Sequence, residues 1–297
     1  MRISDPMRPL ITIGLSIYNG EATLDSAVKS IVAQTYPEWE LLLIDDGSRD
    51  ASYKIAQGFK DERIVVVSDG QNQGLAARLN QAVKMARGKY FCRMDQDDIA
   101  FPDRLKKQVQ FLEEHLDIDL VASSIVVFRN DGSLSGVVQV QGGHEAICRH
   151  PWRGFYFPHP TWMGKTAWFL AHPYSSKADG AEDQLLLYEA CRESRFAGMP
   201  EVLLGYREDR RSFKKMFSRR MVFWRAIAGS AIERGQWGDL LLLFATQPAK
   251  IVGDFLNITQ GIASARNRLG AVSTLTNKAW LDLWHRMNQH DRLRGDE

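Results

Sequence analysis

Three aspartates, Asp95, Asp97 and Asp98, lie within four consecutive positions, directly after the short apolar run Tyr90 to Met94. Carboxylates this close repel one another unless a cation or hydrogen-bond donors neutralise them. Oxygen ligands on a loop suit Mg²⁺ or Mn²⁺, and a diphosphate would complete an octahedral shell around either ion. The alternative is that these are turn and N-cap residues, because Pro102 soon opens a helix. The apolar run before the cluster favours metal binding.

A second acidic cluster, Asp-Asp-Gly-Ser at residues 45–48, follows the apolar run Leu41 to Ile44. Taken alone, it is typical of a tight turn between a strand and a helix, with Ser48 or Asp50 as the helix cap. The functional alternative is a carboxylate that accepts hydrogen bonds from a nucleobase or ribose. The segment at residues 16–20 is likewise either a turn or a loop that contacts a nucleoside.

Strands and helices alternate around these clusters. Apolar, β-branched runs predict strands, and apolar residues at helical spacing predict helices between them. The strands are expected at 11–17, 41–44, 64–67 and 90–94, and the helices at 24–32, 48–58, 75–86 and 102–112. This alternation predicts a parallel sheet with helices on both faces, in which ligands bind beyond the carboxyl ends of the strands. Both acidic clusters sit at such ends, so we expect them to share one site.

The pattern changes after about residue 120. Residues 120–128 predict one or two strands, and Asn130-Asp131-Gly132 is typical of a hairpin turn. Residues 140–180, rich in Gly, His, Trp and Pro, predict loops with short elements, and residues 183–192 predict a helix. From about residue 212 the sequence is mostly helical. We therefore expect a main domain at residues 8–210 and a helical C-terminal region at residues 211–297.

The composition narrows the class of protein. Cys92, Cys148 and Cys191 are far apart and form no CxxC pair, which argues against a disulfide framework or a zinc site and fits a reducing compartment. Residues 1–9 hold no apolar signal-peptide core, and no run of about 18 apolar residues exists, so we expect no signal peptide and no transmembrane helix. The expected location is the cytoplasm.

Five short motifs occur in a fixed order along the chain. They are Ser16-Ile-Tyr-Asn19, Asp45-Asp-Gly-Ser48, Asn72-Gln-Gly74 with Arg78 and Asn80, Asp95-Gln-Asp-Asp98, and Glu182-Asp183. The series resembles the inverting GT-A glycosyltransferases of family 2 over roughly residues 10–210. The resemblance implies the α/β GT-A fold, which is Rossmann-like with a mainly parallel sheet and helices on both faces. The QxxRW motif of processive polysaccharide synthases is missing, which disfavours a processive enzyme.

The resemblance implies roles for the residues that match on the donor side. Ser16 and Asp46 correspond to residues that hold the donor base. Asp95, Asp97 and Asp98 match the DXD-type motif, in which Asp97 and Asp98 would contact the ribose and the metal ion, one of them as the direct ligand. The segment that lines the nucleotide contains Asn72, Gly74 and Arg78.

On the acceptor side, Asp183 matches the family's catalytic base. An acceptor hydroxyl must lose a proton as it attacks the anomeric carbon, which a nearby carboxylate can accept. Without the resemblance, Glu182-Asp183 is simply favourable charge at a helix N-terminus. His159 lies in a segment that borders the acceptor, and Arg207 in one near the diphosphate, where a cation stabilises the leaving group.

The resemblance also implies partners: a nucleotide-sugar donor, with a UDP-sugar favoured, and a glycan or lipid-linked acceptor in surface polysaccharide synthesis. Residues 207–225 interleave basic and aromatic side chains, which is typical of a helix lying on the inner face of a membrane. The alternative is a helical subdomain packed on the sheet. Nucleic acid is disfavoured because RNA-binding stacking motifs are missing.

Two rival functions use a similar fold. A nucleotidyltransferase would carry a basic, glycine-rich phosphate loop after the first strand, but residues 16–20 hold no basic side chain. A non-catalytic nucleotide-binding protein would not need Asp183 and a complete acidic cluster. We therefore expect a glycosyltransferase that uses Mg²⁺ or Mn²⁺.

Overall fold

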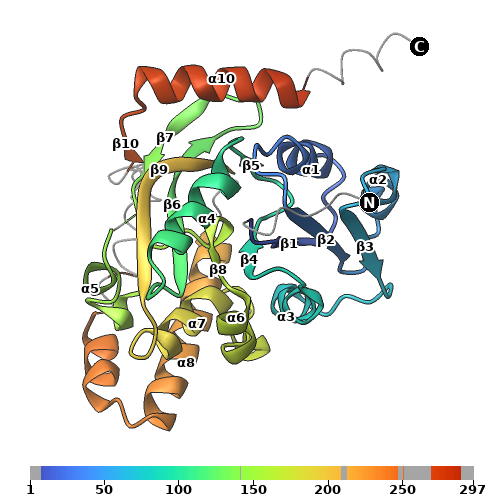
Figure 1. The fold of residues 1–297 in the computed structure, drawn as a ribbon. Helices are drawn as coiled ribbons and strands as arrows, with labels where there is room; N and C mark the ends of the chain where they lie inside the picture. Colours follow the sequence, from blue (N-terminus) through green and yellow to red (C-terminus); the bar gives the residue numbers. More distant parts are fainter. Residues whose placement is uncertain (1–7, 141, 209–212, 247–249, 251–268, 289–297) are drawn as a thin grey trace.

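The computed structural model describes residues 8–140, 142–208, 213–246, 250 and 269–288, with no side-chain description at 213–216 (Figure 1). Its N-terminal half alternates strands and helices as expected. The parallel strands are β1 (Ile11–Ile17), β2 (Trp39–Asp45), β3 (Ile64–Ser68) and β4 (Tyr90–Arg93), in the order β4-β1-β2-β3. The helices are α1 (Leu24–Val32), α2 (Ser52–Gly58), α3 (Leu75–Met85) and α4 (Arg104–Glu114).

Helices cover both faces of this half of the sheet. Successive residues of a strand point to opposite faces. In β2, Leu41 and Leu43 pack in the core that contains the apolar stripe of α1, whereas Leu42 and Ile44 pack in the core that contains α3. A strand buried on both faces has a nearly continuous apolar sequence, which is why β2 was recognisable.

The second half of the sheet is mostly antiparallel, so the whole sheet is mixed. β8 (Met163–Lys165) joins β4 to β6 (Leu120–Phe128), and β6 forms a hairpin with β7 (Leu134–Val138). The long strand β9 (Phe196–Arg207), which we did not predict, runs parallel to β6 and also pairs with the short β5 (Ile99–Ala100). β9 ends beside the loop that carries Asp97 and Asp98, so it completes the site.

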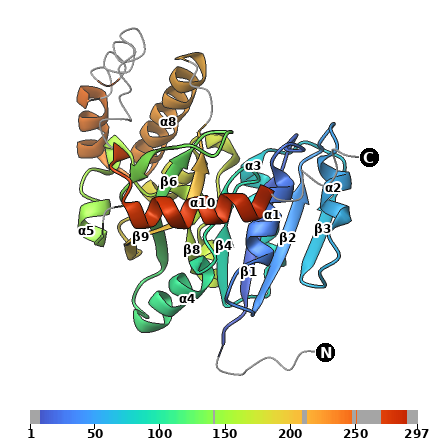
Figure 2. The same ribbon diagram turned by 90° about the horizontal axis from the view of Figure 1, so that it is seen from above.

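The described C-terminal residues contribute to the same sheet and core. β10 (Leu269–Gly270) pairs with β7, and α10 (Thr274–Asn288) crosses the sheet (Figure 2). Trp280 is fully buried there, and its Nε1 donates to the carbonyl oxygen of Gly132 at 2.8 Å. The division expected at residue 210 remains a prediction, but α10 does not form a core of its own.

The other elements are short, except for one long helix. They are α5 (His144–Ile147), α6 (Thr166–Ala171), α7 (Glu182–Ala190), α8 (Phe213–Glu233), a helical stretch at 237–246, and three 3₁₀ turns, η1 (Pro151–Arg153), η2 (His159–Thr161) and η3 (Ser176–Ala178). The predictions of short elements at 140–180 and of a helix at 183–192 are confirmed, as is the prediction of helices beyond 212 for the described residues; residues 247–249, 251–268 and 289–297 lie outside them.

Candidate active site

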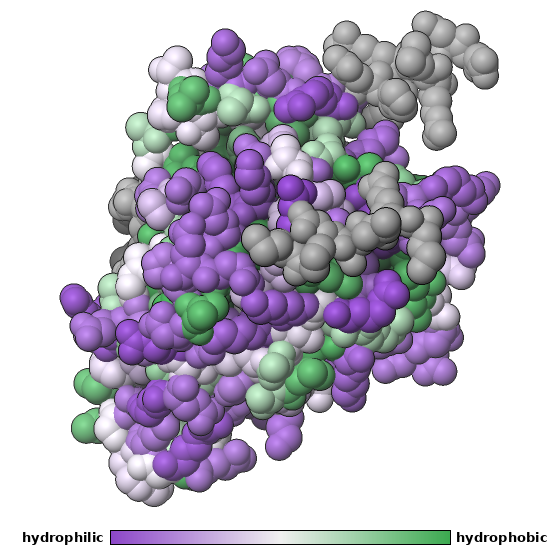
Figure 3. All heavy atoms as spheres, viewed as in Figure 1, coloured by the Kyte–Doolittle hydropathy of each residue, from purple (hydrophilic) through white to green (hydrophobic). Residues whose placement is uncertain are grey.

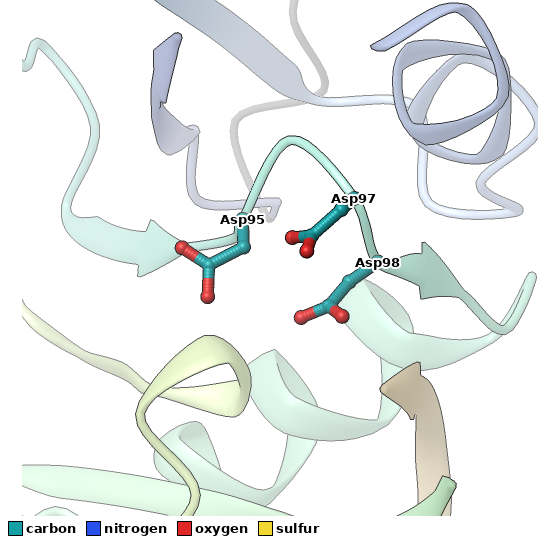
Figure 4. Close-up of side chains that lie close together, drawn as sticks. All are labelled: Asp95, Asp97 and Asp98. Atoms are coloured by element: carbon teal, nitrogen blue, oxygen red, sulfur yellow. The ribbon is translucent and has the colours of Figure 1, made fainter. Parts of the chain in front are cut away.

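The three predicted aspartates converge in the loop between β4 and β5. Asp95, Asp97 and Asp98 each offer an oxygen, and these oxygens all lie within 4.8 Å of one another (Figure 4). Asp98 is fully buried, and its Oδ1 accepts a hydrogen bond from the backbone N–H of Arg207 at 3.0 Å. Its Oδ2 has no hydrogen-bond partner among the described residues. The loop therefore gathers negative charge that the described part of the chain does not fully satisfy.

Burial raises the pKa of two of these carboxyls. The pKa of Asp97 rises to about 6, first because of burial and then because Asp95 carries a like charge nearby. Burial, followed by the charges of Asp97 and Asp95, raises the pKa of Asp98 well above its usual value. Arg93 and Arg207 oppose both changes only in part. A cation bound by the cluster would favour the ionised forms.

The donor set suits a hard divalent cation. All three side chains present oxygen, which Mg²⁺ and Mn²⁺ prefer, and a buried oxygen without a partner is the kind of group that an ion satisfies. Because Asp95 already forms an ion pair with Arg93, Asp97 and Asp98 are the better candidates for direct ligands.

Gln96, which the sequence analysis did not single out, joins this loop to the loop after β1. Its Oε1 accepts from the backbone N–H of Tyr18 at 2.8 Å, and its Nε2 donates to the carbonyl oxygen of Tyr18 at 2.9 Å. A Cβ at Gly20 would lie 2.4 Å from the amide group of Gln96, so a larger residue at that position would displace this amide. No sequence signal marks Gln96, since pairing of a side chain with a backbone 78 residues away depends on the fold.

Hydrogen bonds also join the loops after β1 and β2. The backbone N–H of Asn19 donates to Ser48 Oγ at 3.1 Å, the N–H of Arg49 donates to Asn19 Oδ1 at 2.8 Å, and the N–H of Gly20 donates to Ser52 Oγ at 2.7 Å. Ser16 lies near the end of β1, in register with Ile44. The first two motifs thus form one surface next to the aspartates, as the strand order requires.

The carboxylate and the carbonyl oxygen of Asp46 already accept hydrogen bonds from other groups of the protein. Its Oδ1 accepts from the N–H of Gln73 at 2.7 Å and from Arg78 Nε at 2.8 Å, and its Oδ2 accepts from the N–H of Gly74 at 3.0 Å. Asn72 Nδ2 donates to the carbonyl oxygen of Asp46 at 3.1 Å. The carboxylate has about four lone-pair positions, so little acceptor capacity remains for a nucleobase.

Arg78 likewise has no donor left for a nucleotide. It is only 2% exposed; its Nε donates to Asp46, both nitrogens of its fork donate to Asp69, and they also reach Gln81 and the carbonyl oxygen of Gln71. These bonds use all five N–H groups of a guanidinium. Asp46 and Arg78 therefore hold the loop at 71–74 in its conformation through these hydrogen bonds.

Asp183 lies in the first turn of α7, where sequence analysis placed it. Burial is the main cause that raises its pKa, and a hydrogen bond from Gln184 Nε2 at 2.9 Å partly opposes this. Its neighbour Glu182 is buried, accepts from the N–H of Gly180 at 2.7 Å and also has a raised pKa. A raised pKa makes a carboxylate a stronger base, so Asp183 has the properties that proton abstraction requires.

His159 is buried next to this region, where its surroundings disfavour the charged imidazolium. Burial lowers its pKa well below the usual value, and the charge of Arg93 acts in the same direction. Its Nε2 lies 2.9 Å from the hydroxyl of Tyr174, whose backbone is held by Asn80. In this geometry His159 supports the site from within the core.

Comparisons with known proteins agree with this geometry. A family model described as glycosyl transferase family 2 matches residues 12–173, which is 162 of the 297 residues. The chain belongs to glycosyl transferase family 2. EpsE of Bacillus subtilis (strain 168), a protein named as a glycosyltransferase, is 33% identical to this chain over 214 residues. The match covers 70% of this chain and 76% of EpsE. The predicted resemblance to this family is confirmed, and the nucleotidyltransferase alternative is not supported.

Solved structures confirm the GT-A fold of this family 2 glycosyltransferase. Staphylococcus aureus TarS 1–349 in complex with UDP-GlcNAc superposes with a TM-score of 0.62 at 19% identity, covering 94% of this chain and 81% of that one. The mannosyltransferase PcManGT from Pyrobaculum calidifontis, in complex with GDP-Man and Mn²⁺, superposes with a TM-score of 0.61 at 16% identity. That superposition covers 98% of this chain and 83% of PcManGT.

Arg207, expected near the diphosphate, braces the aspartate loop of this glycosyltransferase. Its Nε donates to the carbonyl oxygen of Asp97 at 2.8 Å, and its Nη1 donates to Asn130 Oδ1 at 3.1 Å. Its guanidinium also lies 4.7 Å from the ring centre of Phe128 and 6.0 Å from that of Trp284. These contacts hold the backbone of Asp97 in place. The expected contact of Arg207 with the diphosphate stays a prediction.

The basic, aromatic segment at 207–225 is only partly described, because residues 209–212 and the side chains of 213–216 lie outside the described residues. Phe223 is buried, Trp224 packs against Phe244 at 5.0 Å between ring centres, and Phe217 is exposed. The face seen in Figure 3 is largely hydrophilic, with scattered hydrophobic residues. No helix within the described ranges is long and apolar enough to cross a membrane.

Proposed function

We propose that this family 2 enzyme uses Mg²⁺ or Mn²⁺ to transfer a sugar, with inversion, from a nucleotide sugar to a hydroxyl group of its acceptor. The observation that carries the proposal is the carboxylate cluster of Asp95, Asp97 and Asp98, which leaves a buried oxygen of Asp98 without a partner. A divalent cation supplies charge neutralisation for the diphosphate as it leaves.

The donor is proposed to be a nucleoside-diphosphate sugar, with a UDP-sugar favoured. The TarS structure that resembles this chain contains UDP-GlcNAc, and the PcManGT structure contains GDP-Man and Mn²⁺. Asp97 and Asp98 would hold the cation, and Asp95 would face the sugar or ribose. Ser16, Asn72 and Gly74 would border the nucleoside, while Asp46 and Arg78 keep the loop at 71–74 in shape, as their hydrogen bonds indicate.

Asp183 is proposed to be the catalytic base. It accepts the proton of the acceptor hydroxyl, whose oxygen forms a bond to the anomeric carbon while the bond to the diphosphate oxygen breaks. Attack from the face opposite the leaving group inverts the anomeric configuration. The raised pKa of Asp183, caused mainly by burial, suits this step because it makes the carboxylate a stronger base.

The acceptor is proposed to be a glycan or a lipid-linked glycan used for surface polysaccharide, reached at the cytoplasmic face of the membrane. Support comes from three exposed side chains of α8, which are Phe217, Arg219 and Arg225. Charged and aromatic side chains on one helix can contact anionic lipid headgroups. The burial of Phe223 and the packing of Trp224 reduce the surface available for this contact.

Calorimetry tests the donor site directly. UDP and GDP are titrated into the wild-type enzyme with Mn²⁺ and again with EDTA, and into Asp97→Ala with Mn²⁺. We expect tight binding only for the wild type with Mn²⁺. Asp25→Ala is the matched control, because Asp25 pairs with Lys29 on the exposed side of α1. Equal binding with Mn²⁺ and with EDTA would refute the metal assignment.

Sugar transfer is then tested with purified acceptors and by hydrolysis of the donor alone. Asp183→Asn should bind donor as the wild type does and lose transfer, since its amide cannot accept the acceptor proton. Turnover that persists in Asp183→Asn would remove this residue from its proposed role. An anomeric product of retained configuration, identified by NMR coupling constants, would refute inversion.

A further inference from the structure

The loop after β1 has an uncommon backbone conformation at Asn19. Its φ is 49°, in the left-handed region, and every other described residue with a positive φ is a glycine. Asparagine tolerates this region better than most residues do, but it keeps such a conformation only where neighbouring groups hold it. The shape of the loop at residues 18–20 therefore depends on the contacts that its backbone makes.

Two other loops make these contacts. From the aspartate loop, Gln96 accepts from the N–H of Tyr18 at 2.8 Å and donates to its carbonyl oxygen at 2.9 Å, so one amide group engages both backbone groups of one residue. From the loop after β2, Ser48 Oγ accepts from the N–H of Asn19 at 3.1 Å. Gln96 thus links the residue that precedes Asn19 to the loop that carries the proposed metal ligands.

The same amide packs against Gly20. A Cβ there would lie 2.4 Å from the amide carbon and the amide oxygen of Gln96, and the three atoms nearest to it all belong to this amide. The φ of Gly20 is not positive, so alanine suits its backbone. Because the end of a flexible side chain moves more easily than a backbone, Gly20→Ala displaces the amide. A substitution on a second loop therefore breaks the same link.

We propose that Gln96 is a positioning residue that holds the loop at 18–20 in a fixed place relative to the metal-binding loop. Gln96 stands between Asp95 and Asp97 in the chain, so its backbone belongs to the segment that would hold the cation and diphosphate. The inference rests on the proposed function, in which Ser16 and the loop after it border the nucleoside. Gln96 then sets the spacing between the nucleoside end and the diphosphate end of the donor site.

This role predicts different effects on two ligands. Without the amide of Gln96, Asn19 is free to leave its left-handed conformation, and fewer molecules have a loop that is ready for the nucleoside. The apparent affinity for a nucleotide falls by that fraction. Inorganic pyrophosphate with Mn²⁺ fills only the diphosphate end, so its affinity does not depend on the loop at 18–20. A loss confined to the nucleotide is therefore the mark of this role.

Calorimetry with Mn²⁺ compares UDP with inorganic pyrophosphate. UDP should bind at least about tenfold more weakly to Gln96→Ala and Gln96→Met, which remove the amide, and to Gly20→Ala, which displaces it. Pyrophosphate should bind each variant within about twofold of its wild-type affinity. Gln110→Ala is the matched control and should change neither affinity, because the amide of Gln110 donates to Glu114 on the exposed side of α4.

The double variant Gly20→Ala/Gln96→Ala separates one shared link from two unrelated disturbances. If both substitutions break the same link, the double variant loses no more UDP affinity than Gln96→Ala alone, and losses that multiply would overturn the proposal. An unchanged UDP affinity, or an equal loss of pyrophosphate affinity, would also overturn it. Thermal unfolding identifies the folded variants, and each single variant suffices for the comparison. A wild-type enzyme that binds neither ligand would instead refute the proposed function, and the role of Gln96 with it.

Discussion

The backbone N–H of Arg207 donates to Asp98 Oδ1 at 3.0 Å, joining the end of β9 to the aspartate loop across 109 residues of sequence. The side chain of Arg207 reinforces this link through the carbonyl oxygen of Asp97 and the amide of Asn130. Two of the proposed metal ligands are thus held by one residue at the end of a strand. The site depends on β9 as much as on β4.

Arg207→Ala should weaken binding of the nucleotide with Mn²⁺ by about tenfold. This factor equals the ~1.4 kcal/mol of one lost charge-assisted hydrogen bond. Arg207→Lys should recover little, because lysine lacks the planar fork that reaches both Asp97 and Asn130. Calorimetry and thermal unfolding measure both effects. A variant with normal stability and nucleotide affinity but a low kcat would instead assign Arg207 to the leaving group alone.

Asp97→Asn should stabilise the metal-free enzyme while abolishing its response to Mn²⁺. The folded-state pKa of Asp97, about 6, lies above its ordinary value of 3.8, so the free energy of unfolding falls as the pH rises from about 4 to about 6 and stays lowered above that pH. The gain should be ~1–2 kcal/mol at pH 7.5 and should fade toward pH 4, where the wild-type carboxyl is protonated in the folded state. Unfolding in urea with EDTA at both pH values measures it; an equal gain at pH 4 would contradict the electrostatic cause.

Asp46→Asn should destabilise the protein much more than Asp69→Asn, although both remove a partner of Arg78. Asp46 is buried with Arg78, and the loss of its buried charge-assisted hydrogen bonds costs ~1.5–3 kcal/mol, although Arg78 keeps its ion pair with Asp69. Asp69 is exposed, so water replaces its contact and only a small loss is expected. Urea unfolding of both variants, with UDP binding as a second readout, provides the comparison. Equal stabilities would mean that Asp46 is free to serve the nucleobase, as the family resemblance implies.

The sequence alone was sufficient to predict β1 to β4 and the aspartate cluster. Buried parallel strands have continuous apolar runs, and their carboxyl ends lie at one edge of the sheet. It was not sufficient for β9. The Pro200-Glu201 pair interrupts its apolar pattern, and the register with β6 shifts there, between Ser123 and Ser124. The role of Gln96 escaped for another reason. It depends on a partner from a distant segment, which only the folded chain brings together.

Trp280→Ala should destabilise the whole protein, including the part before residue 210. Trp280 is fully buried among β5, β6 and α10, its ring centre lies 4.6 Å from that of Phe128, and a Cβ on Gly205 would lie 2.2 Å from its ring. Replacing a large buried aromatic residue with alanine costs ~3–5 kcal/mol. Leu281→Ala is the matched control, since Leu281 is 42% exposed on the same helix.

Thermal unfolding followed by both circular dichroism and the Mn²⁺-dependent binding of UDP distinguishes two outcomes for Trp280→Ala. If α10 belongs to the core of the main domain, both signals shift together to lower temperature, because Trp280 and Trp284 of α10 pack against Phe128, and Phe128 and Trp284 contact Arg207. If residues 211–297 fold as an independent unit, a second transition separates from the first and UDP binding keeps its wild-type midpoint. The close packing of Trp280 on Gly205 of β9 favours the single transition, in which release of the C-terminal helix also disturbs the aspartate loop that β9 holds.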